Sequence, residues 1–179
     1  TQIALGTAVG GATAGQQTGN RALLWGGILG VVPDLDVFVT PFFSEVQGLA
    51  IHRGFSHSIV FTLLASPLFG WLIYRYADKK TSTASLSRWV ALSLLVIATH
   101  ILLDTFTNYG TQVFQPFSNY PAAFSSIFII DPLYTLPLLI GVVLAALHKK
   151  LPRPGFRANK WGLILSTFYL GLTLLAKGY

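Results

Sequence analysis

The chain has 179 residues, of which 53% are hydrophobic and only 10% are charged, and its mean hydropathy is +0.61. A soluble domain carries about 25% charged residues, so this chain lacks a water-facing shell, and disorder and a soluble dehydrogenase-like fold are excluded. The absence of cysteine excludes a disulfide scaffold and a thiolate metal site. In so apolar a chain, we interpret the formal charge of +6 as a sign of membrane topology in preference to nucleic-acid binding.

The first 32 residues are apolar apart from a polar turn at residues 16–21. Residues 1–15 are rich in Ala and Gly, which suits a helix packed closely against others, and the apolar stretch 22–32 stops at Pro33. At about 1.5 Å per residue neither piece spans a bilayer comfortably, so we expect one or two short or tilted helices here. No basic stretch precedes an apolar run, so no cleavable signal peptide is expected.

Longer apolar segments follow, at residues 58–76, 89–107, 127–147 and 161–176. A transmembrane helix needs about 20 apolar residues, and these segments approach that length with few charges or none. We therefore expect an all-α fold, a polytopic integral membrane helical bundle with about four clear transmembrane helices. The whole chain, residues 1–179, is expected to form a single membrane-embedded domain.

Basic side chains cluster at one set of helix ends, which the positive-inside rule places in the cytoplasm. Ten of the twelve lie there: Arg21, Arg75, Lys79, Lys80, Arg88, Lys149, Lys150, Arg153, Arg157 and Lys160. The four tryptophans lie near the same ends, as interfacial anchors would: Trp25, Trp71, Trp89 and Trp161. Five of the six acidic residues and three of the four histidines lie near the opposite ends. The polar chemistry is therefore expected on the non-cytoplasmic side, and the basic segment 148–160 is expected to bind anionic lipid headgroups.

The sequence Pro33-Asp34-Leu35-Asp36 offers two carboxylates. Pro33 disfavours continued helix, and in an extended segment Asp34 and Asp36 point to one face. Two carboxylates on one face repel each other unless a divalent cation offsets their charge. A solvated pair of aspartates at a helix end is the alternative, and this motif alone favours that alternative.

Two histidines, His52 and His57, bracket a turn containing Gly54, which allows the chain to bend so that both imidazoles face one centre. Arg53 between them suits an anionic substrate group such as phosphate. The alternative is a polar loop that ends in a serine helix cap, Ser58. Metal ligation is favoured because His57 opens a membrane helix, where a histidine without a role is costly.

His100 and Asp104 lie inside an apolar helix at a spacing of four residues, on one helical face. An aspartate inside a membrane span costs about 2.5–3.5 kcal/mol on insertion scales, so such residues indicate function by default. The alternative is a single His–Asp hydrogen bond that locks two helices together. Asp131, beside Pro132 at a helix start, fits a helix cap and a ligand equally well.

Two weaker candidates complete the sequence pattern. Gln2 lies at the same expected depth, and the polar segment 108–112 offers neutral hydrogen bonds to a substrate. His148 lies in the basic cytoplasmic segment and is assigned no role in the site.

Together, three histidines and up to four aspartates converge from distant segments. Nitrogen and oxygen ligands without sulfur suit Zn, Mn or Fe, and up to seven ligands exceed one tetrahedral site, which favours two or more ions. The expected chemistry is attack by a metal-activated water on a phosphoryl or carbonyl centre. A spare aspartate, Asp104 or Asp131, or the hydroxide itself would handle the proton, and Arg53 would bind the substrate.

Several motifs resemble the YdjM-like family of membrane-bound metal-dependent hydrolases. They are the stretches 1–6 (TQIALG), 30–36 (GVVPDLD), 52–58 (HRGFSHS), 100–110 (HILLDTFTNYG) and 128–132 (FIIDP). The resemblance implies a metal-dependent hydrolase in a prokaryotic cytoplasmic membrane. Carried onto this chain, it implies metal ligands at Asp34, Asp36, His52, His57, His100, Asp104 and Asp131. Many relatives are similar in motif style to zinc-dependent phospholipases and open with Thr-His, whereas Gln2 stands in place of that His here.

Other classes fit less well. A lipid phosphatase of the acid-phosphatase type needs a Ser-Gly-His block, and an intramembrane metalloprotease needs HExxH; the sequence has neither. A non-enzymatic membrane protein, such as a metal transporter or a partner in a membrane complex, remains the alternative. The favoured substrate is a phosphodiester or a phospholipid, so the expected partners are membrane lipids and a small-molecule or lipid substrate, with no nucleic acid.

Overall fold

A computed structural model describes residues 1–43, 53–78, 84–148 and 155–178. Within these ranges the chain is helical and has no β-strand, and a single antiparallel bridge joins Thr111 to Ala122. The predicted all-α fold is therefore confirmed.

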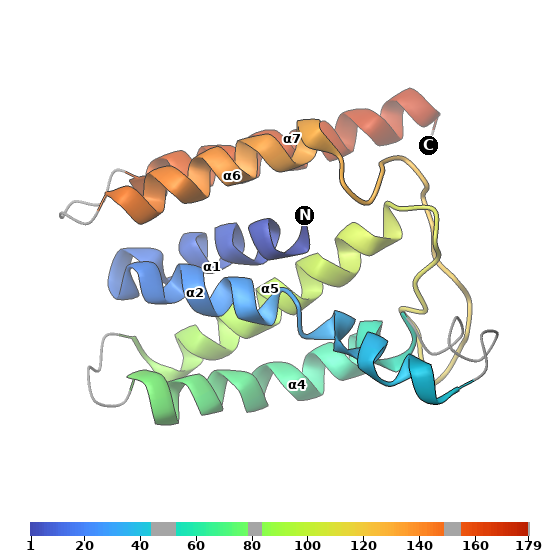
Figure 1. The fold of residues 1–179 in the computed structure, drawn as a ribbon, viewed down its shortest axis with the longest axis horizontal. Coiled ribbons are helices and arrows are strands. Elements are labelled where there is room, and N and C mark those ends of the chain that lie inside the picture. The colour runs from blue at the N-terminus through green and yellow to red at the C-terminus, as the bar shows by residue number, and fades with distance from the viewer. Residues whose placement is uncertain (44–52, 79–83, 149–154, 179) are drawn as a thin grey trace.

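The helices form three pairs stacked in layers (Figure 1). Their bounds are α1 Gln2–Thr18, α2 Asn20–Leu29, α4 Ile59–Leu72, α5 Leu86–Thr105, α6 Pro132–Leu147 and α7 Gly155–Lys177. Short 3₁₀ helices η1 (Pro33–Phe38), η2 (Thr40–Phe42) and η3 (Phe55–His57) lie between α2 and α4, and a π-helical turn, η4 (Ile73–Asp78), extends α4. The α1/α2 pair lies between α4/α5 and α6/α7, because α1 contacts α5 on one side and α6 and α7 on the other.

Glycines allow α1 and α2 to approach until their backbones touch. A Cβ atom added at Gly26 would lie 2.2 Å from the carbonyl oxygen of Gly6, and one added at Gly10 would lie 2.3 Å from that of Ala22. The two helices are joined at Gly19, whose φ of 62° and ψ of −136° suit glycine. The expected close packing of the Ala/Gly-rich first helix is confirmed.

Two helices are long and apolar enough to cross a membrane, the continuous segment Ile59–Ala77 and α5. A third span results if α2 and the segment Pro33–Phe42, bent by 41°, are counted together. The helix expected to begin at residue 127 begins only at Pro132, and α6 has 16 residues. Fewer helices of spanning length are therefore found in the described chain than the sequence pattern predicts.

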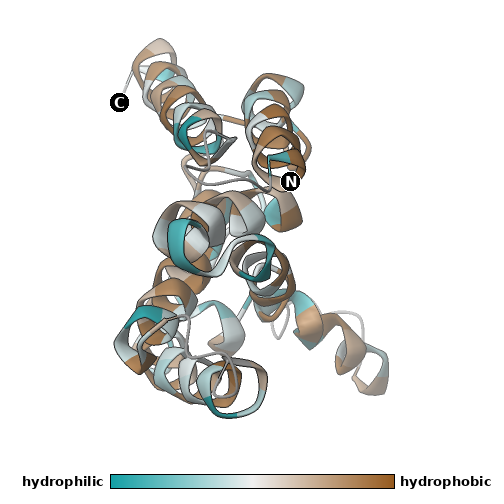
Figure 2. Ribbon diagram, turned by 90° about the vertical axis from the view of Figure 1, so that its left-hand side faces the viewer, coloured by the Kyte–Doolittle hydropathy of each residue, from teal (hydrophilic) through white to brown (hydrophobic). Residues whose placement is uncertain are grey.

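Hydrophobic residues recur along the helices, where the ribbon is brown (Figure 2), and many of their side chains are exposed. They include Leu63, Leu64 and Leu68 on α4, Leu136 and Ile140 on α6, and Ile164, Leu165 and Phe168 on α7, all of them exposed. Such an apolar exterior suits a lipid environment, in which these side chains meet no water.

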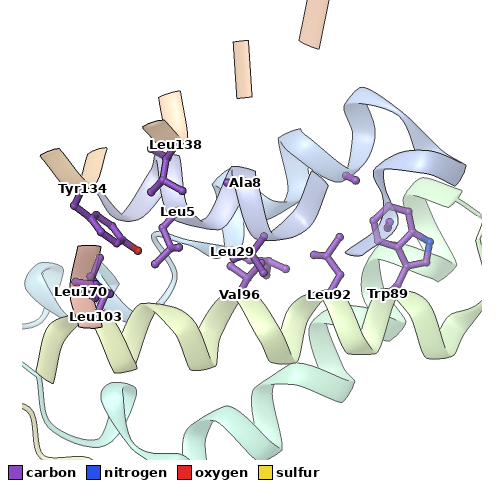
Figure 3. Close-up of a cluster of buried hydrophobic side chains, with 14 of the residues drawn as sticks. Leu5, Ala8, Leu29, Trp89, Leu92, Val96, Leu103, Tyr134, Leu138 and Leu170 are labelled. Atoms are coloured by element: carbon purple, nitrogen blue, oxygen red, sulfur yellow. The ribbon is translucent and has the colours of Figure 1, made fainter. Parts of the chain in front are cut away.

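The buried core follows one face of α5 (Figure 3). Leu92 and Val96 of α5 pack there with Ala8 of α1 and Leu29 of α2. Trp89 is fully buried in this core, so its prediction as an interfacial anchor is wrong; the space beneath the α1/α2 pair takes up its ring. Leu103, in the C-terminal half of α5 that also carries His100 and Asp104, belongs to the same core as Ala8 and Leu29.

Candidate metal site

Four side chains from three separate segments meet at one end of the bundle. Asp34 comes from η1, His57 from η3, and His100 and Asp104 from α5. Each offers one ligand atom, and these four atoms all lie within 4.8 Å of one another. The predicted convergence of these residues is thereby found in the structure.

Five of the six distances between the four ligand atoms are close to those of a tetrahedron, and the sixth, between the carboxylates of Asp34 and Asp104, is at most 4.8 Å. The Nε2 atoms of His57 and His100 are 3.3 Å apart, and Oδ1 of Asp34 lies 3.4 Å from each. Oδ2 of Asp104 lies 3.2 Å from His57 Nε2 and 3.5 Å from His100 Nε2. Zinc bonds of about 2.0–2.2 Å to nitrogen and oxygen in a regular tetrahedron separate the ligand atoms by about 3.3–3.6 Å.

Contacts behind the histidines direct both Nε2 atoms inward. Nδ1 of His100 lies 2.9 Å from the carbonyl oxygen of Gly30, which only accepts, so this nitrogen donates and Nε2 keeps its lone pair. Nδ1 of His57 lies 3.0 Å from the Ser56 hydroxyl, which itself donates to Oδ2 of Asp36 at 2.8 Å. These contacts orient the rings as the outer partners of metal-bound histidines do.

A polar atom in this group lacks a hydrogen bond. Oδ2 of Asp104 is buried and has no hydrogen-bond partner in the described part of the chain. It faces two imidazole nitrogens that present lone pairs when the rings are neutral, an arrangement that repels without a cation or a proton between them. The donor set therefore fits a divalent cation with nitrogen and oxygen ligands, such as Zn, Mn or Fe.

Asp36 lies behind His57 and outside the group of four. Its Oδ2 is 3.4 Å from Nδ1 of His57 and accepts a hydrogen bond from the backbone N–H of Arg53 at 3.1 Å. The expectation that Asp34 and Asp36 share one face assumed an extended segment, whereas residues 33–38 form the 3₁₀ helix η1. In such a helix side chains two residues apart point about 120° away from each other, so Asp34 faces the group and Asp36 supports His57.

The negative charge of the carboxylates in and behind the group raises the pKa of His57. Burial alone would lower this pKa, but the carboxylates of Asp104, Asp34 and Asp36 outweigh burial and raise it to about 10. A buried imidazole that holds its proton so strongly marks a place where positive charge is favourable.

Arg53 lies next to the group on a strained backbone, with φ of 60°. Its Nη1 donates to the Thr107 hydroxyl at 2.8 Å, its Nη2 lies 3.6 Å from Oδ1 of Asp104, and its guanidinium stacks on the Tyr109 ring at 5.1 Å. A cavity of about 90 Å³ adjoins it, lined by Thr1, Gln2, Asp34, Arg53, Leu103, Asp104, Thr107, Ile127 and Ile129. Arg53 thus brings a buried positive charge to a small cavity beside the four ligand atoms.

Gln2 holds Asp104 from the other side. Its Nε2 donates to Oδ1 of Asp104 at 2.9 Å and to the carbonyl oxygen of His100 at 3.2 Å. Its Oε1 is buried and has no hydrogen-bond partner among the residues described. With Oδ1 of Asp104 engaged by Gln2 and Arg53, Oδ2 is left for the centre of the group.

A family model described as "YdjM inner membrane protein" matches residues 1–179. The chain belongs to the YdjM family. The uncharacterized protein YfhP of Bacillus subtilis (strain 168) is 31% identical over 141 residues, which cover 77% of this YdjM chain and 40% of YfhP. The chain therefore spans about two fifths of the length of that curated relative. No solved structure matches it. Membership confirms the expected inner-membrane location and names no substrate.

Asp131 lies apart from the four ligand atoms of this YdjM chain. Its Oδ1 accepts hydrogen bonds from the backbone N–H groups of Leu133 and Tyr134 at 2.9 and 3.2 Å, and its Oδ2 accepts one from the Tyr169 hydroxyl at 3.0 Å. Asp131 is the cap of α6, one of the two roles that the sequence left open. His52, expected as a ligand, lies outside the described residues.

Sequence reasoning missed several supporting groups of the YdjM site. Thr107 lies three residues after Asp104, one helical turn on, and that spacing is the signal that could have found it. The carbonyl of Gly30 carries no sequence signal. Two other groups were anticipated: Ser58 caps α4, as the sequence suggested, by accepting from the Phe61 N–H at 3.0 Å. The segment 108–112, expected to contact a substrate, supports Arg53, since the Gln112 N–H donates to the Arg53 carbonyl at 3.0 Å.

Proposed function

We propose that this chain is a membrane-bound metal-dependent hydrolase that uses a metal-activated water on a phosphoester or phospholipid-like substrate. The observation that carries the proposal is the convergence of four ligand atoms, from Asp34, His57, His100 and Asp104, within 4.8 Å of one another beside a buried arginine. Zn fits this geometry, and Mn and Fe share the same ligand chemistry.

The four atoms account for one ion. A second ion, as the number of His and Asp residues predicts, would need ligands from Asp36, His52 or Asp131. Asp131 already uses Oδ1 to cap α6 and Oδ2 to accept from the Tyr169 hydroxyl of α7, so it contributes least to this proposal.

The residues around the cavity have different roles in the proposed reaction. A bound divalent ion would supply an acidified water and polarise the bond to be cleaved. Arg53 would bind an anionic oxygen of the substrate, since a guanidinium matches phosphate geometry and keeps its charge when buried. Asp34, whose side chain is 38% exposed, is the most accessible of the four and lies on the side where a substrate oxygen would arrive. Asp104 is held by Gln2 and Arg53 to keep one oxygen aimed at the centre.

One observation favours the alternative of a non-enzymatic membrane protein with a structural His/Asp cluster. Four protein ligands fill a tetrahedron, and structural zinc sites are closed in this way, whereas catalytic sites keep an open position. The exposed position of Asp34 and the adjoining cavity favour hydrolysis, because exchange of this ligand for water or substrate would open the site.

We place the site at the non-cytoplasmic face. The site lies at the end of the bundle where α5 finishes, whereas Arg21, Arg88 and Arg157 lie near the starts of α2, α5 and α7 at the other end. Basic residues mark cytoplasmic ends.

The first test is metal content, measured by elemental analysis of detergent-purified protein with His57→Ala, Asp104→Ala and the distant control His148→Ala. We expect at least one Zn, Mn or Fe per chain in the wild type and the control, and loss of metal in both site variants. Cleavage of bis-p-nitrophenyl phosphate that stops with chelator and returns with Zn would establish hydrolysis. Retained metal without hydrolysis of any phosphoester would favour the structural alternative, and a wild type that binds no metal on reconstitution would contradict the proposal.

A further inference from the structure

The cavity beside Arg53 is closed on most sides. Of its lining residues, Arg53, Leu103, Asp104, Thr107 and Ile127 are buried, and Thr1 and Gln2 are half-buried. Asp34 has a side chain 38% exposed, and Ile129 is 45% exposed. Among described residues, the open side therefore lies between η1, which carries Asp34, and the segment 127–130.

Both segments that border this opening expose apolar side chains. On η1, Phe38 is 72% exposed, and in the segment 127–130 Phe128 is 80% and Ile130 73% exposed; none of the three lines the cavity itself, but all lie close in sequence to residues that do. In residues 33–43 and 126–130 the charged residues are Asp34 and Asp36 alone, and these turn toward the histidines. An opening bordered in this way is unfavourable in water and favourable in the acyl or interfacial region of a bilayer.

The two segments also continue membrane-facing helices. Residues Pro33–Phe42 continue α2, and together they are apolar enough for a bent span. Residues 127–130 lead into α6, whose outer face exposes Leu133, Leu136 and Ile140. The opening therefore lies between segments that belong to the apolar, lipid-facing surface of the protein.

The size of the cavity limits what enters it. Drug-sized ligands occupy pockets of about 300–1,000 Å³. The cavity of about 90 Å³ admits a small anionic group next to Arg53, but no acyl chain. A lipid would therefore insert only its phosphoryl group and leave its chains in the bilayer.

We propose that the substrate is a membrane lipid that reaches the site sideways from the bilayer, with its phosphoryl group at Arg53 and its acyl chains against Phe38 and Phe128. This inference rests on the proposed function and selects the bilayer over water as the source of the phosphoester.

The position of the opening is tested without hydrolysis. The chain has no cysteine, so Phe38→Cys and Phe128→Cys each give a single site for a spin label in phosphatidylglycerol–phosphatidylcholine vesicles. Leu64→Cys, on the outer face of α4, is the lipid-facing control, and exposed Ser87→Cys at the basic end is the water-facing control. We expect both test labels to collide with oxygen as the Leu64 label does. Labels that collide instead with a water-soluble nickel chelate, as at Ser87, would overturn entry from the bilayer.

The substrate is tested with Zn-loaded protein in the same vesicles. We expect the Phe38→Ser/Phe128→Ser double variant to lower the ratio of phosphatidylglycerol cleavage to bis-p-nitrophenyl phosphate cleavage about tenfold, because apolar contact with the lipid chains is lost. Phe117→Ser, an exposed aromatic residue outside both segments, should leave the ratio unchanged. An unchanged ratio in the double variant would overturn the lipid assignment. Cleavage of neither compound would overturn the proposed function and the lipid assignment with it, whatever the spin labels report about the opening.

Discussion

The Nε2 atoms of His57 and His100 face each other at 3.3 Å, and Nδ1 of each ring lies in a hydrogen bond on the far side. Two inward lone pairs beside the carboxylates of Asp34 and Asp104 are stable only when something positive lies between them. A proton can fill this place, and so can a metal ion. The competition between the two makes metal binding depend on pH.

Zinc affinity should rise with pH. The pKa of His57, raised from 6.5 to about 10, means that the metal-free site holds a proton at neutral pH, which Zn must displace. The apparent affinity should therefore increase about tenfold per pH unit for one displaced proton and level off above the raised pKa. Competition with a zinc-binding dye at pH 6.5, 7.5 and 8.5 measures this slope. An affinity that stays constant over this range would show that no proton occupies the site.

Asp36→Asn should weaken zinc binding about 10–100-fold without abolishing it, the usual cost of losing an outer partner of a metal-bound histidine. The amide keeps the shape of Asp36 but loses the charge that faces His57 Nδ1 at 3.4 Å. Zinc titration of the purified variant measures the loss.

Asp131→Asn is the matched control for that variant. Asp131 caps α6, so its substitution should lower the melting temperature and leave zinc affinity unchanged. If Asp131→Asn lost metal as His57→Ala does, Asp131 would be a ligand and its role as cap would be secondary.

Gln2→Ala should lower zinc affinity about tenfold, because Asp104 loses the donor that fixes Oδ1 and frees Oδ2 for the metal. Gln2→Glu should lower it further, since a second carboxylate 2.9 Å from Asp104 repels it. Wild-type zinc affinity in Gln2→Asn would show that the position needs only an amide group. Wild-type zinc affinity in all three variants would show that Gln2 does not support the site.

The parts of the site that follow from local geometry could be predicted. His100 and Asp104 share a helix face, and a four-residue spacing fixes that relationship wherever the helix packs. Asp36 could not be placed, because its direction depends on whether residues 33–38 are extended or 3₁₀-helical, and Pro33 is compatible with both. The role of Gln2 depends on a contact across 102 residues of chain, which no local spacing encodes.

The fold, like the site, could be predicted from the sequence only in part. The Ala/Gly content of residues 1–15 predicted close packing, and the structure has backbone contact between α1 and α2. The start of α6 was predicted five residues too early, because residues 127–130 are apolar enough for a helix, whereas Asp131 caps the helix and Pro132 begins it. Composition indicates what a segment tolerates, and the capping residue decides where the helix begins.

Gly26→Ala should destabilise the protein, because the added methyl would lie 2.2 Å from the carbonyl oxygen of Gly6 and neither backbone can move alone. Overpacking of this kind costs about 1–3 kcal/mol. Gly171→Ala, in α7, is the matched control: nothing lies within 4 Å of its added Cβ, so the change should stabilise the helix by about 0.5–1 kcal/mol. Thermal unfolding in detergent compares the melting temperatures of the two variants.

Because α1 carries Gln2 and α2 leads to Asp34, separation of these helices should also weaken zinc binding in Gly26→Ala, while Gly171→Ala should bind zinc as the wild type does. Equal melting temperatures for the two variants would contradict the close contact between α1 and α2.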